Sequence, residues 1–149
     1  MQKIIVLLLA FFSFSCKSNM NHDLVEKKLD QVMTEFFGLK KKSWIIREVI
    51  ESENSSIADG TKFVTFVEIT DIEDFINKNR VKGESLLNDP SDHFKRLFPR
   101  SSTLSKSFKH DKCEFFAHSL KLRGTRRKAY LFICIDLEKK SAILDYAEH

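Results

Sequence analysis

Glycine and proline are scarce in this sequence of 149 residues, which holds 4 glycines and 2 prolines. Collagen-like, low-complexity and linker-rich chains need far more of both residues, so these classes are excluded. The four glycines are also isolated from one another. A dinucleotide-binding G-x-G-x-x-G turn, a phosphate-binding G-x-x-x-x-G-K-[ST] loop and a G-x-S-x-G nucleophile elbow are therefore all absent.

Metal-binding motifs are lacking as well. The sequence has three cysteines and five histidines, but no H-E-x-x-H and no paired C-x-x-C. His110, Glu114 and His118 follow one another at intervals of four, which on a helix would bring them together. The surrounding residues favour a strand, on which the two histidines would lie about 26 Å apart. We therefore expect no metal site, no cofactor and no catalytic residue.

The residues that are present are typical of a globular protein. Hydrophobic residues make up 42% of the chain, charged residues 31% and aromatic residues 11%. A disordered chain would have fewer aromatic residues, and a membrane bundle would have fewer charged ones. No internal repeat and no long Pro/Gly/Ser-rich linker divides the chain, so we expect one domain.

The N-terminus, MQKIIVLLLAFFSFSC, is the most informative stretch. The cation Lys3 precedes eleven residues, Ile4–Phe14, that are apolar apart from one serine. This run suits the core of a signal peptide and is shorter than the roughly 20 residues that span a bilayer. The order of cation, apolar core, small Ser15 and Cys16 resembles the signal peptide of bacterial lipoproteins. It departs from that family's pattern at the two residues before Ser15, where a leucine and a small residue are usual.

The resemblance implies that residues 1–15 are removed and that Cys16 is acylated, which would anchor the protein in the cell envelope. Lys17-Ser18-Asn19 lacks the acidic second residue associated with inner-membrane retention. The resemblance therefore favours the outer membrane, with the domain facing the periplasm or the exterior. Ordinary cleavage, which would release a soluble secreted protein, and a buried N-terminal strand remain as alternatives.

We expect a short lipidated tether over residues 16–22 and a single α+β domain over residues 23–149. Six extended residues between Cys16 and the domain would reach only about 20 Å, so the domain would lie close to the lipid. Residues 23–37 have apolar side chains every three to four positions and predict an amphipathic helix. Asp23 and Glu26 suggest a capping box at its start, and Gly38 a C-terminal stop.

Five strands and a helical insertion are expected in the rest of the domain. Trp44–Ile50 predicts a strand, with a short helix as the alternative, and a polar loop at 52–60 leads to a second strand at 62–70. Thr70 and Glu73 would cap a helix, and Pro90 would begin another. Residues 100–110 suggest a loop. The last strands form an antiparallel meander and are expected at 115–122, 130–137 and 142–147.

The middle strand of the meander is apolar on both faces, so it should lie inside the sheet with helices covering at least one side. The predicted fold is α+β, with the N-terminal helix packed on a mostly antiparallel sheet of about five strands and helices inserted between the second and third strands. This order is loosely similar to cystatin-like and nuclear-transport-factor-like rolls. No motif ties residues 23–149 to either family.

Cys113 and Cys134 are an even pair in a compartment that permits disulfides. A two-residue turn at Arg123-Gly124 would place them directly opposite each other on neighbouring strands, within disulfide range. A bridge would enclose 20 residues and add roughly 3 kcal/mol of stability. Two unlinked thiols in an apolar face are the alternative.

Positive charge gathers late in the chain. Residues 105–128 hold eight Lys/Arg against two acidic residues. The cations expected at the hairpin tip are Lys121, Arg123, Arg126, Arg127 and Lys128. Such a tip could bind an anionic surface or an acidic protein partner, or it could simply be a solvated edge that keeps the protein soluble. At a membrane-anchored position nucleic acid is not expected.

The function expected from these features is that of an envelope lipoprotein with a small, non-enzymatic binding or structural domain. A small hydrolase in an α+β cone and a toxin-neutralising (immunity) lipoprotein are the alternatives. Catalytic groups converge in space without any fixed sequence spacing, so the sequence leaves an enzyme open.

Overall fold

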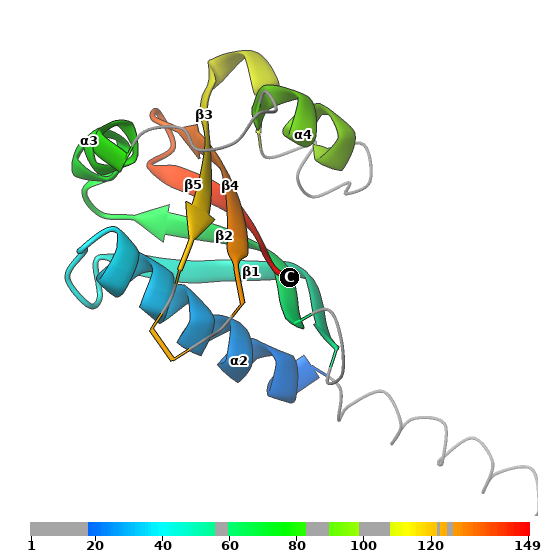
Figure 1. Ribbon diagram of the computed structural model, residues 1–149. Coiled ribbons are helices and arrows are strands. Elements are labelled where there is room, and N and C mark those ends of the chain that lie inside the picture. Colours follow the sequence, from blue (N-terminus) through cyan, green and yellow to red (C-terminus); the bar gives the residue numbers. More distant parts are fainter. Residues whose placement is uncertain (1–17, 56–59, 83–89, 99–107, 122, 125–126) are drawn as a thin grey trace, which may run out of the picture.

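A computed structural model describes residues 18–55, 60–82, 90–98, 108–121, 123–124 and 127–149 (Figure 1). The leader, Cys16, Arg126 and most of the loop expected at 100–110 lie outside these residues. The predicted α+β class is confirmed: within these residues three α-helices accompany a five-stranded antiparallel sheet. The strand order is β1-β2-β5-β4-β3.

Helix α2 spans Ser18–Gln31 and continues into a π-helical turn, η1, at Val32–Phe36. The predicted helix therefore exists but begins earlier, and residues 18–22 are helical rather than an extended tether. Asp23 consequently lies inside the helix, so the predicted capping box with Glu26 is wrong. Gly38 follows the helix at a φ of +65°, as the predicted stop requires.

Strands β1 (Trp44–Ser55) and β2 (Gly60–Ile69) form a long antiparallel hairpin. The structure selects the strand over the helical alternative at the start of β1 and continues it through residues expected to be loop. Polar residues are tolerated there because β1 is an edge strand. Register shifts after Ile46 and after Val49 mark irregularities that bend such a strand.

The insertion consists of α3 (Ile72–Lys82) and α4 (Pro90–Leu97). Pro90 is the first residue of α4, as predicted. The cap of α3 differs from the prediction: the backbone N–H of Asp74 donates to Oδ1 of Asp71 at 3.0 Å. A carboxylate caps a helix at least as well as a hydroxyl, so the helix begins after Asp71 rather than after Thr70.

The meander consists of β3 (Cys113–Leu120), which follows the short 3-10 helix η3 (His110–Lys112), then β4 (Ala129–Asp136) and β5 (Ser141–Glu148). Leu120 pairs with Ala129, so eight residues join β3 to β4. The predicted two-residue turn is wrong. It would have set Lys121 directly opposite Arg126, and like charges in that position destabilise a strand pair.

Hydrophobic clusters cover both faces of the sheet, with α2 and α4 on opposite sides (Figure 1). One cluster joins α2, η1 and α3 to inward side chains such as Leu131, Ile133 and Leu144. The other joins Phe94 of α4 to Cys134 and other residues of the opposite face. Strand β4 is thus buried on both faces, as its composition predicted. Among the described residues, no helix is both long and apolar enough to cross a membrane.

Candidate functional site

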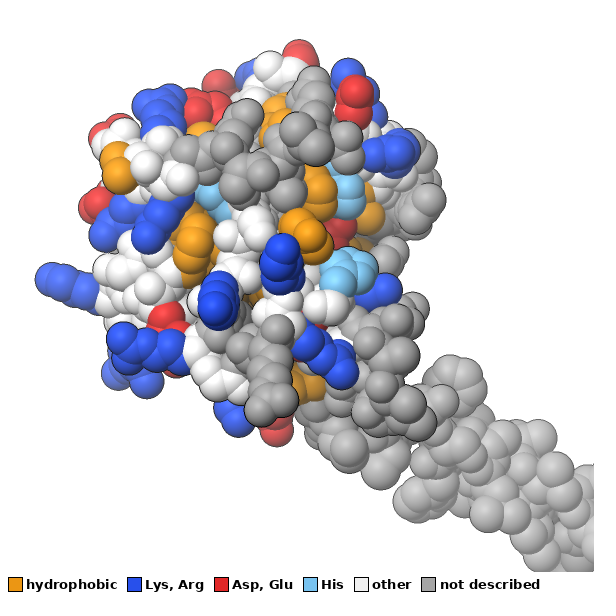
Figure 2. Space-filling view, in the orientation of Figure 1, with side chains coloured by type: hydrophobic (Ala, Val, Ile, Leu, Met, Phe, Trp, Pro, Cys, Tyr) orange, Lys and Arg blue, Asp and Glu red, His pale blue; other side chains and the backbone are white. Residues whose placement is uncertain are grey.

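The cations predicted to form a binding patch lie in the connection between β3 and β4, residues 121–128, here called the basic loop. Lys121, Arg123 and Lys128 are exposed and Arg127 is half-buried, whereas Arg126 lies outside the described residues. Figure 2 shows Lys and Arg side chains spread over the face of the molecule that carries this connection. The described part of the loop therefore presents positive charge to the surroundings.

The basic loop is fixed to the ends of two other strands. The backbone N–H of His149 donates to the carbonyl of Lys128 at 2.9 Å. Nη1 of Arg127 lies so close to Gly60 that a Cβ at Gly60 would come within 2.8 Å of it, and within 2.6 Å of Cβ of Glu148. Since Gly60 also has a φ of +71°, this close approach requires glycine.

A buried carboxylate lies beneath this contact. Oε1 of Glu148 accepts hydrogen bonds from Nζ of Lys28 at 2.5 Å and from the hydroxyl of Tyr146 at 2.6 Å. The backbone N–H of Thr61 donates to Oε2 at 3.3 Å. Burial pushes the pKa of Glu148 upward, but these donors outweigh burial and hold the pKa below its usual value. Burial and the hydrogen bond to Glu148 raise the pKa of Tyr146.

The Glu148 contacts place the basic loop beside α2, the helix that leads back towards Cys16. Lys28 lies ten residues beyond the first residue of α2, which corresponds to about 15 Å along the helix. Figure 1 shows the β3–β4 connection beside α2 on the same side of the molecule. The basic loop therefore lies beside the part of α2 that contains Lys28, about 15 Å along the helix from Ser18.

The two cysteines lie on the same face of the sheet but are not opposite each other. Cys113 pairs with Asp136, and Cys134 pairs with Phe115, so the prediction of direct opposition is wrong. They are diagonal neighbours and free thiols, with Cys134 fully buried and Cys113 half-buried. A hydrogen bond with the Cys134 thiol lowers the pKa of Cys113, whereas the same bond, together with burial, raises the pKa of Cys134. A disulfide between them stays a prediction.

A histidine–carboxylate pair joins α4 to β5. Nε2 of His93 lies 2.6 Å from Oδ2 of Asp145, and the imidazole stacks on Phe132 with ring centroids 3.9 Å apart. Sequence reasoning missed the pair because 52 residues separate its members. A hydrolytic triad would need a nucleophile on the other imidazole nitrogen. Within the described part of the chain no hydroxyl or thiol is hydrogen-bonded to His93.

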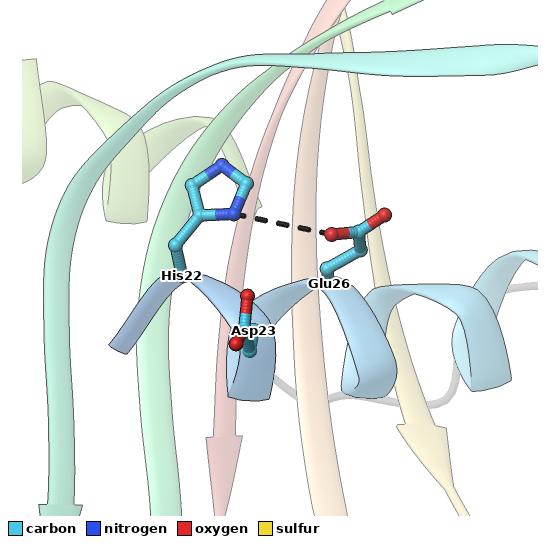
Figure 3. A group of neighbouring side chains, drawn as sticks. All are labelled: His22, Asp23 and Glu26. Carbon is cyan, nitrogen blue, oxygen red and sulfur yellow. Dashed lines mark ion pairs between the residues drawn. The ribbon is translucent and has the colours of Figure 1, made fainter. Parts of the chain in front are cut away.

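One exposed cluster on α2 has the composition of a metal site (Figure 3). Single ligand atoms of His22, Asp23 and Glu26 lie within 4.8 Å of one another. Nδ1 of His22 is 3.9 Å from Oε2 of Glu26, which accounts for their approach as an ion pair. The i, i+4 spacing was the available signal, but the expected helix began too late to include His22. All three side chains are exposed, so water competes for any ion there.

A groove of about 550 Å³ lies between α2 and the start of β1. It is lined by three carboxylates, three lysines and one indole ring: Asp23, Glu26, Asp30, Lys27, Lys41, Lys42 and Trp44. Because the two signs of charge are balanced, the groove favours neither a cationic nor an anionic ligand. Among the described residues no phenylalanine lines this groove, and the phenylalanines that are buried belong to the two hydrophobic clusters.

Comparison with known proteins adds no relative. No family model, no curated protein and no solved structure matches this chain.

Proposed function

We propose that this protein is a cell-envelope lipoprotein, anchored through acyl chains on Cys16, whose domain binds an anionic surface and catalyses no reaction. The order of residues in the leader supports the anchor.

The observation that carries the binding role is the position of the basic loop. The loop lies beside α2, about 15 Å along the helix from Ser18, and only Lys17 separates Ser18 from Cys16 in the sequence. A lipid on Cys16 would hold α2, and the basic loop beside it, close to the membrane. Each cation near an anionic membrane surface contributes about 1 kcal/mol of attraction. The anchor and the basic loop would then act on the same surface.

The hydrolase alternative has the His93–Asp145 pair in its favour. That pair has two of the three residue types of a catalytic triad, but its contacts fasten α4 to the sheet. A structural role in holding α4 on the sheet therefore accounts for the His93–Asp145 pair, and we favour the binding role over the hydrolase. The acylation experiment below tests the location, and the vesicle experiment tests the binding surface.

Acylation is tested by expressing the full chain in a bacterium and determining the mass of the membrane-bound product. We expect a chain that begins at Cys16 and carries acyl groups, and we expect Cys16→Ser to abolish both the lipid and the processing. An intact leader, or an unmodified Cys16 on a processed chain, would contradict the anchor.

The surface is tested with a chain that begins at Lys17 and so lacks Cys16 and its lipid, mixed with vesicles that either contain or lack anionic lipid. We expect binding only to anionic vesicles, with affinity falling as salt is added, because the attraction is screened. The variant Lys121→Glu/Arg123→Glu should bind about 30-fold more weakly or worse.

The matched control is Lys40→Glu/Lys109→Glu, which makes the same change of charge at two exposed positions outside the basic loop. This variant should keep most of the vesicle binding. Equal losses in the two variants would show that net charge, and not the basic loop, determines the binding. Unchanged binding in the loop variant would remove the basic loop from the proposal.

A further inference from the structure

Cys113 and Cys134 differ in how they are reached from solvent. Cys113 is the first residue of β3, which lies at the edge of the sheet and follows directly on η3. Its Sγ donates to the carbonyl of Lys109 at 3.3 Å, and the side chain is half-buried. Cys134 is 0% exposed, among the side chains that α4 covers. One thiol is therefore open to a reagent and the other is not.

We propose that Cys113 and Cys134 are a reversible thiol–disulfide pair, in which Cys113 reacts first with an external disulfide and Cys134 then closes the internal bond. The inference does not depend on the proposed membrane surface. Both residues face the same side of neighbouring strands, and Cys113 packs against the cluster that contains Cys134. Cys134 lies two positions along β4 from Asp136, the residue opposite Cys113, so the two cysteines are neighbours on one face of the strand pair.

The chemistry needs a disulfide of the form RSSR, such as glutathione disulfide or the disulfide of an envelope oxidoreductase. The Cys113 thiolate attacks one sulfur of RSSR, and a thiolate RS⁻ leaves with the electrons of the broken bond. The Cys134 sulfur then attacks Sγ of Cys113, and the second RS⁻ leaves. The protons of the two cysteines pass to the two departing thiolates. Two thiols are thereby oxidised to one disulfide, and RSSR is reduced to two RSH.

The first step prepares Cys134 for the second. The hydrogen bond with Cys113 is the largest of the influences that raise the pKa of Cys134, and the charge of Cys113 adds to it. Once Cys113 is in a mixed disulfide it no longer carries a negative charge. Both influences are then removed, and Cys134 ionises more readily beside the sulfur that it attacks.

The diagonal position explains why the bond should be reversible. Diagonal neighbours in an antiparallel pair have Cα atoms about 7–8 Å apart, whereas disulfides usually join Cα atoms about 4.4–6.8 Å apart. Closure must therefore draw the start of β3 towards β4, which is easier at a strand end than in its middle. A disulfide held under such strain is reduced more readily than a relaxed structural one.

The test uses the full chain with Cys16→Ser, so that only the two thiols of interest remain. The folded protein is equilibrated with glutathione and glutathione disulfide at several ratios, alkylated with a maleimide and analysed by mass spectrometry. At oxidising ratios we expect a monomer that is lighter by two hydrogens and carries no maleimide. Dithiothreitol added to the folded protein should restore both alkylation sites.

Two variants separate the roles of the thiols. Cys134→Ala should accumulate glutathione on Cys113, because no second thiol displaces it. In Cys113→Ser, Cys134 should react at least roughly a hundredfold more slowly than Cys113 does in Cys134→Ala, since attack on Cys134 requires local opening. Circular dichroism of both variants verifies that each is folded.

Other outcomes overturn the proposal. Two free thiols at the most oxidising ratio, or glutathione retained on Cys113 of the chain with both cysteines, would exclude the internal bond. Equal rates in the two variants would exclude the assigned order of reaction. A bridge that dithiothreitol reduces only after unfolding would make it a permanent structural link instead.

Discussion

Glu148 brings a carboxylate into a position that is only 6% exposed, at the end of β5. A buried charge is stable only when its hydrogen-bonding capacity is met. Here a lysine, a tyrosine hydroxyl and a backbone N–H meet it. The carboxylate therefore links α2, β2 and β5 at the end of the domain where the basic loop lies.

Glu148→Gln should lower the free energy of unfolding by about 2–4 kcal/mol near neutral pH, since it leaves Lys28 without its carboxylate. The pKa of Glu148 is lower in the folded protein than its usual value of 4.5. Its contribution is therefore fully present above about pH 5 and is lost as the pH falls through the folded-state pKa. Urea unfolding of both proteins at several values between about pH 3 and 7 measures this. The difference between their free energies of unfolding should narrow only at the acid end.

The control for Glu148→Gln is Glu138→Gln, which removes an exposed carboxylate paired with Lys112. Its side chain is 73% exposed, so the change should stay within about 0.5 kcal/mol. Equal effects of the two substitutions, or a difference between wild type and Glu148→Gln that does not vary with pH, would contradict the role given to the buried carboxylate.

Contacts between residues far apart in the sequence were the features that the sequence predicted least well. His118 is buried and lies 2.8 Å from Oδ1 of Asn79, which is 39 residues away. Lys28 and Glu148 are 120 residues apart. No local spacing encodes such pairs, because the fold alone brings their elements together. The cysteines were found as a pair, but their relative position required the register of the strands.

Helix α4 has only eight residues, fewer than an isolated helix needs to be stable in water. Its position must therefore come from packing and from side-chain contacts with the sheet. Phe94 supplies a fully buried ring, and His93 adds both its stacking on Phe132 and its bond to Asp145. The pair is consequently best explained as a fastening of α4.

His93→Ala should loosen α4 without unfolding the strands. Hydrogen exchange in residues 90–98 is expected to become about tenfold faster, for a local loss of about 1.5 kcal/mol from one charge-assisted hydrogen bond. Exchange in β4 and β5 should change little. Arg96→Ala, at an exposed position of the same helix, serves as the control and should leave the exchange unaltered. Equal hydrogen-exchange protection of residues 90–98 in both variants would show that His93 does not hold α4 on the sheet.

Elements were predicted better than their connections. Apolar periodicity identified α2, and runs of β-branched and aromatic residues identified all five strands. The ends failed where two local signals compete, as at Thr70 and Asp71, since either side chain can cap a helix. The predicted β3–β4 register was wrong because a local turn signal at Arg123-Gly124 does not fix which residues of the two strands pair.

At the scale of the whole molecule, two layers of helix share one sheet. Leu29 of α2 is buried in the cluster on one face, and Phe94 of α4 in the cluster on the other. Strands β4 and β5 contribute alternate side chains to both clusters, for example Ile133 to the first and Cys134 to the second. If β4 and β5 unfolded, the buried side chains of both helical layers would be exposed at once. Folding of the two layers should therefore be coupled.

Leu29→Ala and Phe94→Ala test this coupling, since each removes a fully buried side chain from one layer only. Each should lower the free energy of unfolding by about 3 kcal/mol. If the sheet couples the layers, both variants will retain a single urea transition that far-ultraviolet and near-ultraviolet circular dichroism report at the same midpoint. An early transition in Phe94→Ala, seen in the aromatic signal alone, would mean that α4 detaches while α2 and the sheet remain folded. The α4 layer would then be a separable cover over Cys134, and its loss would expose that thiol without global unfolding.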